Sequence, residues 1–312
     1  MQITIQKSEK RDSQTMRVSV IIPVYNAAKT VEDCILSIIN QSLSSSDYEI
    51  IVIDNKSIDQ TKSIINKYPV CYKYEPYPSV YKARNTGFAI SSGEIIAFID
   101  GDCIADKDWL KNGAHTMDQF KVATGLIVPQ LSHRKILYLY DKVITWKSPQ
   151  NQDFNINAGN CFIDRKLFME IGGFNESVIT AGDSILSMIA KQKGYRIGLE
   201  PRAKVYHPVA PFIMRFRRCF REGMGSCLKD SYKFGNTNKI ERRKMLKIKI
   251  FNFVNGLLTD LNLIWAAKNA TKINGWEMFL LYIFCFFFTF QIYAGTIVAR
   301  YFKKLNKKIA LK

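Results

Sequence analysis

Short apolar runs rich in β-branched residues alternate with stretches of helical spacing over the first two thirds of this chain. Four runs have the composition of strands, at 18–24 (VSVIIPV), 48–54 (YEIIVID), 71–75 (CYKYE) and 94–100 (EIIAFID). Between them apolar residues recur at helical steps, namely Val31, Ile35, Ile38 and Ile39, then Ile64, Ile65 and Tyr68. This alternation predicts an α/β fold, in which helices cover both faces of a mainly parallel sheet. A chain of 312 residues can bury a sizeable core of this kind.

Polar clusters follow three of the predicted strands. They read YNAAKT after the first strand, DNKSIDQT around the end of the second and DGDC around the end of the fourth. Open α/β sheets bind their ligands at the carboxyl ends of the strands. We therefore expect the three clusters to line one cleft.

The fourth strand ends in two carboxylates, Asp100 and Asp102, one residue apart. In an extended backbone residues i and i+2 point to the same side, so the two side chains should aim together. Two like charges at such a distance repel by roughly 1–4 kcal/mol, depending on the local dielectric. The pattern predicts a positive charge between them, such as a metal ion. The alternative is that both residues only cap the following turn.

Positive charge is concentrated in the last third of the chain. Residues 201–312 hold 22 of the 45 Lys and Arg residues but only 5 of the 27 Asp and Glu residues. This excess predicts an anionic partner for that region, either a nucleic acid or a membrane surface. The seven cysteines are scattered without a CxxC pair, which indicates neither a disulfide framework nor a zinc site. The polar N-terminal segment lacks the apolar region of a signal peptide, so we expect none.

Two apolar segments lie within the basic region. Residues 250–265 place apolar side chains at steps of three and four just after a Lys/Arg cluster, which favours a helix in a membrane interface over a core helix. Residues 278–299 form an uncharged run of 22 residues, about 33 Å as a helix, which could cross a bilayer core of about 30 Å. Trp276 and Tyr301 would anchor its ends. A re-entrant segment and a buried soluble helix are the alternatives.

Five sequence blocks, taken in order, resemble the nucleotide-sugar glycosyltransferases of family 2, which have the GT-A fold. The blocks are VSVIIPVYN (18–26), VIDNKSIDQT (52–61), ARNTGFAISSGEIIAFIDGDC (83–103), NAGNCFIDRKLFMEIGGFNES (157–177) and GDSILSMIAKQKGYRI (182–197). The resemblance implies a GT-A catalytic domain over 17–210, after a polar tail over 1–16. A basic helical or linker region at 211–249 and a membrane-associated helical region at 250–312 would follow.

The resemblance accounts for the paired carboxylates. In this family the DxD segment holds a divalent metal ion, Mg²⁺ or Mn²⁺, that bridges the diphosphate of the sugar donor. It implies that Asp102 is the direct metal ligand and that Asp100 lies near the donor ribose or sugar. His207, in KVYHPVAP, follows the last apparent strand of the catalytic region. It is a candidate for a further metal or diphosphate contact, with a purely structural histidine as the alternative.

The resemblance also implies a set of donor-binding residues. Asp54 would accept a hydrogen bond from the base, and because a carboxylate suits uracil N3–H, a UDP-linked donor is favoured. Arg84 could face the diphosphate. The alternatives are an aspartate that starts a turn and an arginine on the surface of a helix. The whole implied donor set is Pro23, Tyr25, Asn26, Asp54, Arg84, Asn85, Asp100 and Gly101.

Inverting transfer needs a base that takes the proton of the acceptor hydroxyl, and the resemblance implies Asp183. The family usually carries a glutamate before this aspartate and often an acidic residue two positions after it, where this chain has Gly182 and Ile185. An aspartate at a helix start is also a good N-cap, which is the alternative. Gly159 and Asn160 would form the acceptor side of the site.

These features favour a membrane-associated, metal-dependent inverting glycosyltransferase with its catalytic domain facing the cytoplasm. It would move a sugar from a nucleotide donor to a glycan or lipid-linked acceptor in cell-surface polysaccharide assembly. Transfer to a polyprenyl phosphate is an alternative, in which Asp183 would matter less and the arginines at 215–221 more. A nucleic-acid-binding protein is disfavoured, because a nucleic-acid groove does not use a long apolar run. A catalytically dead scaffold is the remaining alternative.

Overall fold

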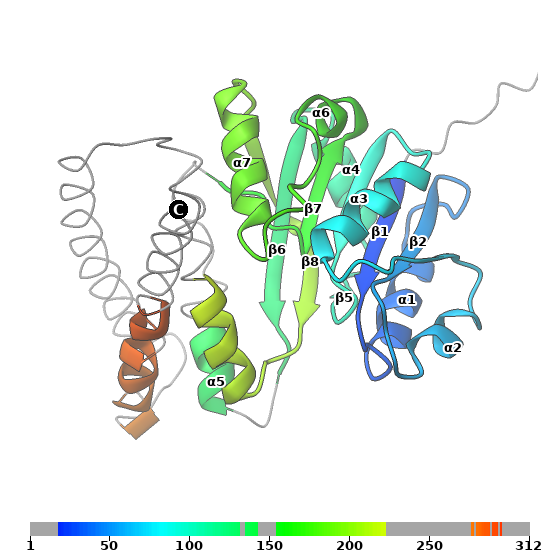
Figure 1. Cartoon of the computed structure of the whole chain (residues 1–312). Helices are drawn as coiled ribbons and strands as arrows, with labels where there is room; N and C mark the ends of the chain where they lie inside the picture. The colour runs from blue at the N-terminus through cyan, green and yellow to red at the C-terminus, as the bar shows by residue number, and fades with distance from the viewer. Residues whose placement is uncertain are drawn as a thin grey trace, which may run out of the picture.

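The predicted strands belong to one eight-stranded mixed sheet, which the computed structural model of the protein shows in Figure 1. The structure describes residues 18–131, 135–142 and 154–222, and residues 276–294 except 278, 288 and 293. The spatial order of the strands is β3-β2-β1-β4-β7-β6-β8-β5. Their bounds are Val18–Val24 (β1), Tyr48–Asp54 (β2), Cys71–Tyr74 (β3), Ile95–Ile99 (β4), Ile104–Ala105 (β5), Val122–Pro129 (β6), Asn160–Asp164 (β7) and Ile197–His207 (β8).

The first four long strands pair as the sequence predicts. β1 is parallel to both β2 and β4, and β2 is parallel to β3. β7 runs antiparallel between β4 and β6, while β6 is parallel to β8 and β5 is antiparallel to β8. The predicted α/β class with a mixed, mainly parallel sheet is therefore confirmed.

Helices cover both faces of this sheet. Their bounds are Val31–Ile39 (α1), Thr61–Ile65 (α2), Val80–Ile90 (α3), Trp109–Thr116 (α4), Lys135–Tyr140 (α5), Arg165–Glu170 (α6) and Gly182–Gln192 (α7), and residues 212–222 are also helical. α1, α2 and α4 pack on the face that receives Val18, Val20 and Ile22 of β1. α3, α6 and α7 pack on the face that receives Ile21, because alternate residues of a strand point to opposite sides.

A third apolar cluster lies outside the sheet, between α5, the 212–222 helix and the helical residues of 276–294 (Figure 1). Leu281 and Cys285 are fully buried there, and Phe212 contacts Phe284 and Phe287 at ring-centroid distances of 5.6 Å. One face of the segment predicted to cross a bilayer is therefore packed on protein. Among the described residues, none of the helices combines the length and apolarity that a bilayer crossing requires.

Several expectations fall on parts of the chain that the structure does not describe. These are the polar tail at 1–16, most of the basic region at 211–249 and the interfacial helix at 250–265. The predicted domain boundaries stay predictions, although the sheet itself runs from Val18 to His207.

Candidate active site

A cleft of about 1060 Å³ lies where β1 and β4 end. Its volume is at the upper end of the range for small-molecule sites. Residues from seven separate stretches of sequence meet in it. Two of the three expected clusters, YNAAKT and DGDC, contribute to the lining, but no residue of DNKSIDQT (54–61) does. Ten of the residues that we expected in the site line it, namely Pro23, Tyr25, Asn26, Arg84, Asp100, Gly101, Asp102, Gly159, Asp183 and His207.

The Asp-Gly-Asp segment is a tight turn, and the extended conformation that we expected is wrong. β4 ends at Ile99, and the Cys103 N–H donates to the Asp100 carbonyl oxygen over 3.0 Å. The turn needs Gly101, because a Cβ at this position would lie 2.5 Å from Val24 Cγ1. Each of the two carboxylates meets a partner of its own.

Asp100 pairs with Arg84 of α3. The distance from Arg84 Nη2 to Asp100 Oδ1 is 2.6 Å, and Arg84 is only 5% exposed. The guanidinium also lies over the ring of Phe174, 5.5 Å from its centroid. Arg84 thus neutralises Asp100 inside the cleft wall, and it is not a surface helix arginine.

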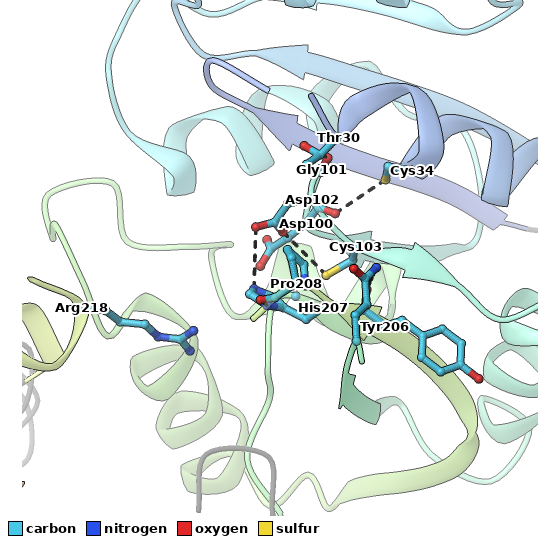
Figure 2. A network of polar contacts seen from close by, with 12 residues as sticks. Thr30, Cys34, Asp100, Gly101, Asp102, Cys103, Tyr206, His207, Pro208 and Arg218 are labelled. Carbon is cyan, nitrogen blue, oxygen red and sulfur yellow. Dashed lines mark hydrogen bonds and ion pairs between the residues drawn. The ribbon is translucent and has the colours of Figure 1, made fainter. Parts of the chain in front are cut away.

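Asp102 faces His207, the last residue of β8, with Oδ2 and Nε2 3.8 Å apart (Figure 2). The other ring nitrogen, Nδ1, lies 2.7 Å from the Pro208 carbonyl oxygen. A carbonyl oxygen only accepts hydrogen bonds, so Nδ1 is the donor. In the neutral ring Nε2 then presents its lone pair toward Asp102, and metal-binding histidines are commonly fixed in this way.

This pair fits a divalent cation. Oδ2 and Nε2 are too far apart for a hydrogen bond, but both atoms are close enough to reach one ion placed between them. Asp102, Cys103 and His207 each place a possible ligand atom within 4.8 Å of the others. Burial raises the pKa of Asp102, the Asp100 charge adds to this rise, and His207 opposes it. A cation at this position would offset the cost of holding Asp102 ionised.

Asp183 lies in the first turn of α7 and lines the cleft. The N-cap of α7 is Ala181, in the left-handed region at φ 65°, and no side chain caps this helix. Asp183 accepts the N–H of the next residue, Ser184, at 2.8 Å. Burial raises the pKa of Asp183, whereas the Ser184 N–H and Arg84 lower it in part. The N-cap alternative is therefore wrong, and the carboxyl is left for other chemistry.

Tyr81 of α3 is a residue that the sequence analysis missed. Its hydroxyl accepts the N–H of Gly182 over 2.8 Å, and its ring stacks on Phe174. A Cβ on Gly182 would lie 2.5 Å from the Tyr81 ring. This contact explains why glycine stands where the family usually has glutamate. The unusual glycine was the available signal, but only the fold shows what fills the space.

Asp54 lies beside the cleft at the end of β2 and is not among its lining residues. It is 2% exposed, and its two oxygens accept the Ser57 N–H at 2.8 Å and the Tyr72 hydroxyl at 3.1 Å. Its contacts hold the turn after β2 onto β3. The expectation that Asp54 accepts a hydrogen bond from the donor base stays a prediction.

Asn85 and Asn160 are structural residues in this fold, which corrects two further assignments. Asn85 Nδ2 donates to the Phe174 carbonyl oxygen and its Oδ1 accepts the Phe174 N–H, at 2.8 and 3.0 Å. Asn160 is fully buried, where it accepts the Trp109 indole N–H and donates to the Leu126 and Ala203 carbonyl oxygens. Neither lines the cleft, whereas Gly159 does, with Asp100 Oδ2 2.7 Å from the place of its missing Cβ.

A mixed sheet with a carboxylate turn and a further carboxylate in one strand-end cleft matches the architecture of the GT-A glycosyltransferases. A sequence model of glycosyl transferase family 2 matches residues 19–172. Glycosyltransferase AglE of Haloferax volcanii is 30% identical over 226 residues, which are 67% of this chain and 72% of AglE. The chain belongs to glycosyltransferase family 2, and it is a glycosyltransferase.

Other similarities support the same assignment. The poly(ribitol-phosphate) β-N-acetylglucosaminyltransferase TarS of Staphylococcus aureus is 26% identical over 59% of this chain, but only 34% of TarS is covered. A mannosyltransferase of Pyrobaculum calidifontis, solved with GDP-Man and Mn²⁺, superposes with a TM-score of 0.64 at 20% identity, over 92% of this chain and 88% of that one. TarS with UDP-GlcNAc gives 0.51 at 18% identity, over 91% and 92%. The two structures share the fold.

Proposed function

We propose that this glycosyltransferase uses a nucleotide-sugar donor and a divalent metal ion, and transfers the sugar with inversion to a hydroxyl of a glycan or lipid-linked acceptor. We place the reaction in cell-surface polysaccharide assembly. The observation that carries the proposal is a single cleft lined by both the Asp102–His207 pair and Asp183. One-step displacement needs both kinds of group in one site, because the leaving diphosphate must be stabilised while the attacking hydroxyl loses its proton.

Asp183 is the general base in this proposal. It takes the proton of the acceptor hydroxyl while that oxygen attacks the anomeric carbon. Because burial raises the pKa of Asp183, its carboxylate binds a proton more strongly than that of an ordinary aspartate does. General-base help of this kind contributes about 10²–10⁴-fold to the rate.

Asp102 and His207 would hold the metal ion, Mg²⁺ or Mn²⁺. When bound, the ion acts as a Lewis acid that stabilises the charge of the departing nucleoside diphosphate. Magnesium strongly prefers oxygen ligands, so the imidazole of His207 favours manganese. Arg84 forms an ion pair with Asp100, which leaves Asp102 as the carboxylate available to the ion.

We propose that the donor is UDP-linked. TarS is solved with UDP-GlcNAc, and the Pyrobaculum mannosyltransferase with GDP-Man. The two oxygens of Asp54 accept hydrogen bonds from Ser57 and Tyr72, so a uracil N3–H would share one of them.

The test is nucleotide release from a panel of UDP-, GDP- and dTDP-sugars without acceptor. One donor should be hydrolysed slowly in Mn²⁺, and a chelator should stop the release reversibly. Asp102→Ala should abolish it, whereas the control Asp118→Ala, an exposed residue that pairs with His115, should not. Binding or hydrolysis of no nucleotide sugar, or full activity of Asp102→Ala, would refute the proposal.

We also propose that the enzyme acts at a membrane, with its catalytic domain facing the cytoplasm. Five large apolar residues of the C-terminal helix expose between 45% and 67% of their surface at steps of three and four: Trp276, Phe279, Ile283, Phe286 and Phe290. This stripe lies in the third of the chain that carries the excess of Lys and Arg. An apolar stripe with nearby positive charge suits insertion into an anionic bilayer surface.

Extraction from membranes tests this second proposal. The full-length protein should resist high salt and be released by detergent. Replacing Phe279 and Phe286 together with serine should shift it toward the salt-extractable fraction, and replacing exposed Ile58 and Leu131 of the catalytic region should not. A wild-type protein recovered from the soluble fraction at low salt would refute membrane association.

A further inference from the structure

The 212–222 helix places two arginines, Arg218 and Arg221, along the cleft. They have no role in the mechanism proposed above. Met214, Arg218, Arg221 and Glu222 line the cleft. Their spacing of four, seven and eight residues from Met214 places them along one face of a helix. The helix begins with FIMRFRR (212–218), in which arginines alternate with apolar and aromatic residues. The sequence alone therefore does not separate the arginines that face the cleft from the others.

A buried ion pair fixes this helix in place. Arg215, 4% exposed, pairs with Asp141, 3% exposed, and lies over the ring of Tyr140 at 5.2 Å. Cys219, one turn later, is buried in the third apolar cluster. Because these contacts hold the back of the helix, its front face presents Arg218 to the cleft at a defined position.

Arg218 is oriented across the cleft toward the Asp102–His207 pair, as Figure 2 shows. Its Nε donates to Glu222 Oε1 over 2.9 Å, one turn further along the helix. Burial alone would lower the pKa of Arg218, but the carboxylates of Glu222, Asp141 and Asp100 raise it. Of these acids, Asp100 also acts on Asp102, so Arg218 and the proposed metal position share one neighbouring charge.

The charged residues that line the cleft do not by themselves balance the charge of a bound diphosphate unless Arg218 is counted. Arg84 balances Asp100. A divalent ion would balance Asp102 and Asp183 together. The two negative charges of a donor diphosphate would then lack a counter-charge, and departure of the sugar adds a third negative charge to the leaving group. Arg218 and Arg221, less Glu222, supply the only further net positive charge among the described residues that line the cleft.

We propose that Arg218 binds the diphosphate of the donor and stabilises the nucleoside diphosphate as it leaves. This inference rests on the proposed use of a nucleotide-sugar donor. An arginine fork is well suited to phosphate oxygens, and Glu222 orients the fork by accepting from Nε. Arg221 lies one turn further out, where it adds charge at the edge of the cleft.

The test compares nucleoside diphosphate with nucleoside monophosphate binding in Mn²⁺, using the pair for the base that the donor panel identifies. Arg218→Gln should weaken diphosphate binding by roughly tenfold to a hundredfold, as expected for loss of a hydrogen bond to a charged group. Monophosphate binding should stay within about twofold. The matched control is Arg217→Gln on the same helix, because Arg217 is exposed and does not line the cleft. Arg218→Lys should fall between wild type and Arg218→Gln.

The outcomes separate this inference from the proposed function. If the wild-type enzyme binds no nucleoside diphosphate and hydrolyses no nucleotide sugar, the proposed donor class fails. If wild type binds the diphosphate and Arg218→Gln keeps its preference over the monophosphate, the assignment of Arg218 is wrong. Unchanged diphosphate binding with a raised KM for acceptor would also overturn it, and would move Arg218 to an anionic acceptor. For each variant, unchanged affinity for the nucleoside monophosphate shows that the protein is still folded.

Discussion

The backbone N–H of Gly182 donates to the hydroxyl oxygen of Tyr81 over 2.8 Å, which ties the start of α7 to α3. Asp183 follows directly, so this bond positions the proposed base. The Tyr81 ring also fills the space that a side chain at position 182 would need. The departure from the family's usual glutamate is therefore coupled to a tyrosine a hundred residues earlier in the sequence.

Replacing Tyr81 with phenylalanine should lower the rate of transfer and leave the fold intact. The change keeps the ring and its stacking on Phe174 but leaves a buried N–H of Gly182 without an acceptor, at a cost of about 1–3 kcal/mol. We expect kcat to fall at least tenfold with little change in donor KM. The measurement is steady-state kinetics alongside thermal unfolding. Wild-type kcat in this variant would show that the bond does not position Asp183.

Asp183→Asn should separate activity from stability. Transfer should fall by about 10²–10⁴-fold, while nucleoside diphosphate binding is retained. Because the folded-state pKa of Asp183 is raised above its unfolded value, ionising this group destabilises the fold as pH rises through the folded pKa. The variant should therefore have a higher Tm than wild type at pH 7, and the difference should vanish toward pH 3. Undiminished turnover would remove Asp183 from the role of base.

The raised pKa of Asp183 also sets the expected pH dependence of the reaction. A base must be ionised, so kcat should decline as pH falls through the folded-state pKa of this carboxyl. That decline should be centred above about 3.9, the ordinary value for aspartate. A pH profile of kcat at saturating donor and metal is the measurement. A decline of kcat centred at or below pH 3.9 would contradict the raised pKa of Asp183.

His207→Ala should weaken metal binding in the presence of nucleoside diphosphate. Loss of a direct ligand should exceed the effect of losing an outer-shell partner, which is about 10–100-fold. Manganese affinity should suffer more than magnesium affinity, since the lost ligand is an imidazole. Calorimetry or manganese resonance spectroscopy gives the affinities directly. His115→Ala is the control, because His115 is exposed and pairs with Asp118. Equal metal affinity in the two variants would make His207 structural.

Asp141→Leu should loosen the 212–222 helix without unfolding the sheet. It leaves Arg215 buried without its carboxylate, and breaking a buried pair in this way typically costs about 3–5 kcal/mol. Hydrogen exchange should rise in 212–222 and stay unchanged in β1 and β4. Adding Arg215→Met to the variant should restore most of the protection. Equal exchange in wild type and Asp141→Leu would show that the pair does not hold the helix.

Local patterns in the sequence were sufficient for the first four strands, β1 to β4, of the eight-stranded sheet. β1 and β2 have the bounds that the apolar runs predict, and α1 covers the residues that recur at helical steps. The strand-end rule correctly placed Tyr25, Asp102 and their neighbours in one cleft. These inferences succeed because burial on both faces of a strand and on one stripe of a helix leaves a direct periodic signal.

The partners of each polar side chain were decided by the tertiary structure. The spacing of Asp100 and Asp102 suggested one shared cation, but a turn sends one carboxylate to Arg84 and the other toward His207. Likewise, nothing local shows that Asn160 is a buried hydrogen-bonding centre. The sequence by itself determined the fold class, the family and several of the stretches that form the cleft. Which side chains face that cleft depended on contacts between residues far apart along the chain, because hydrogen bonds and ion pairs have no sequence period.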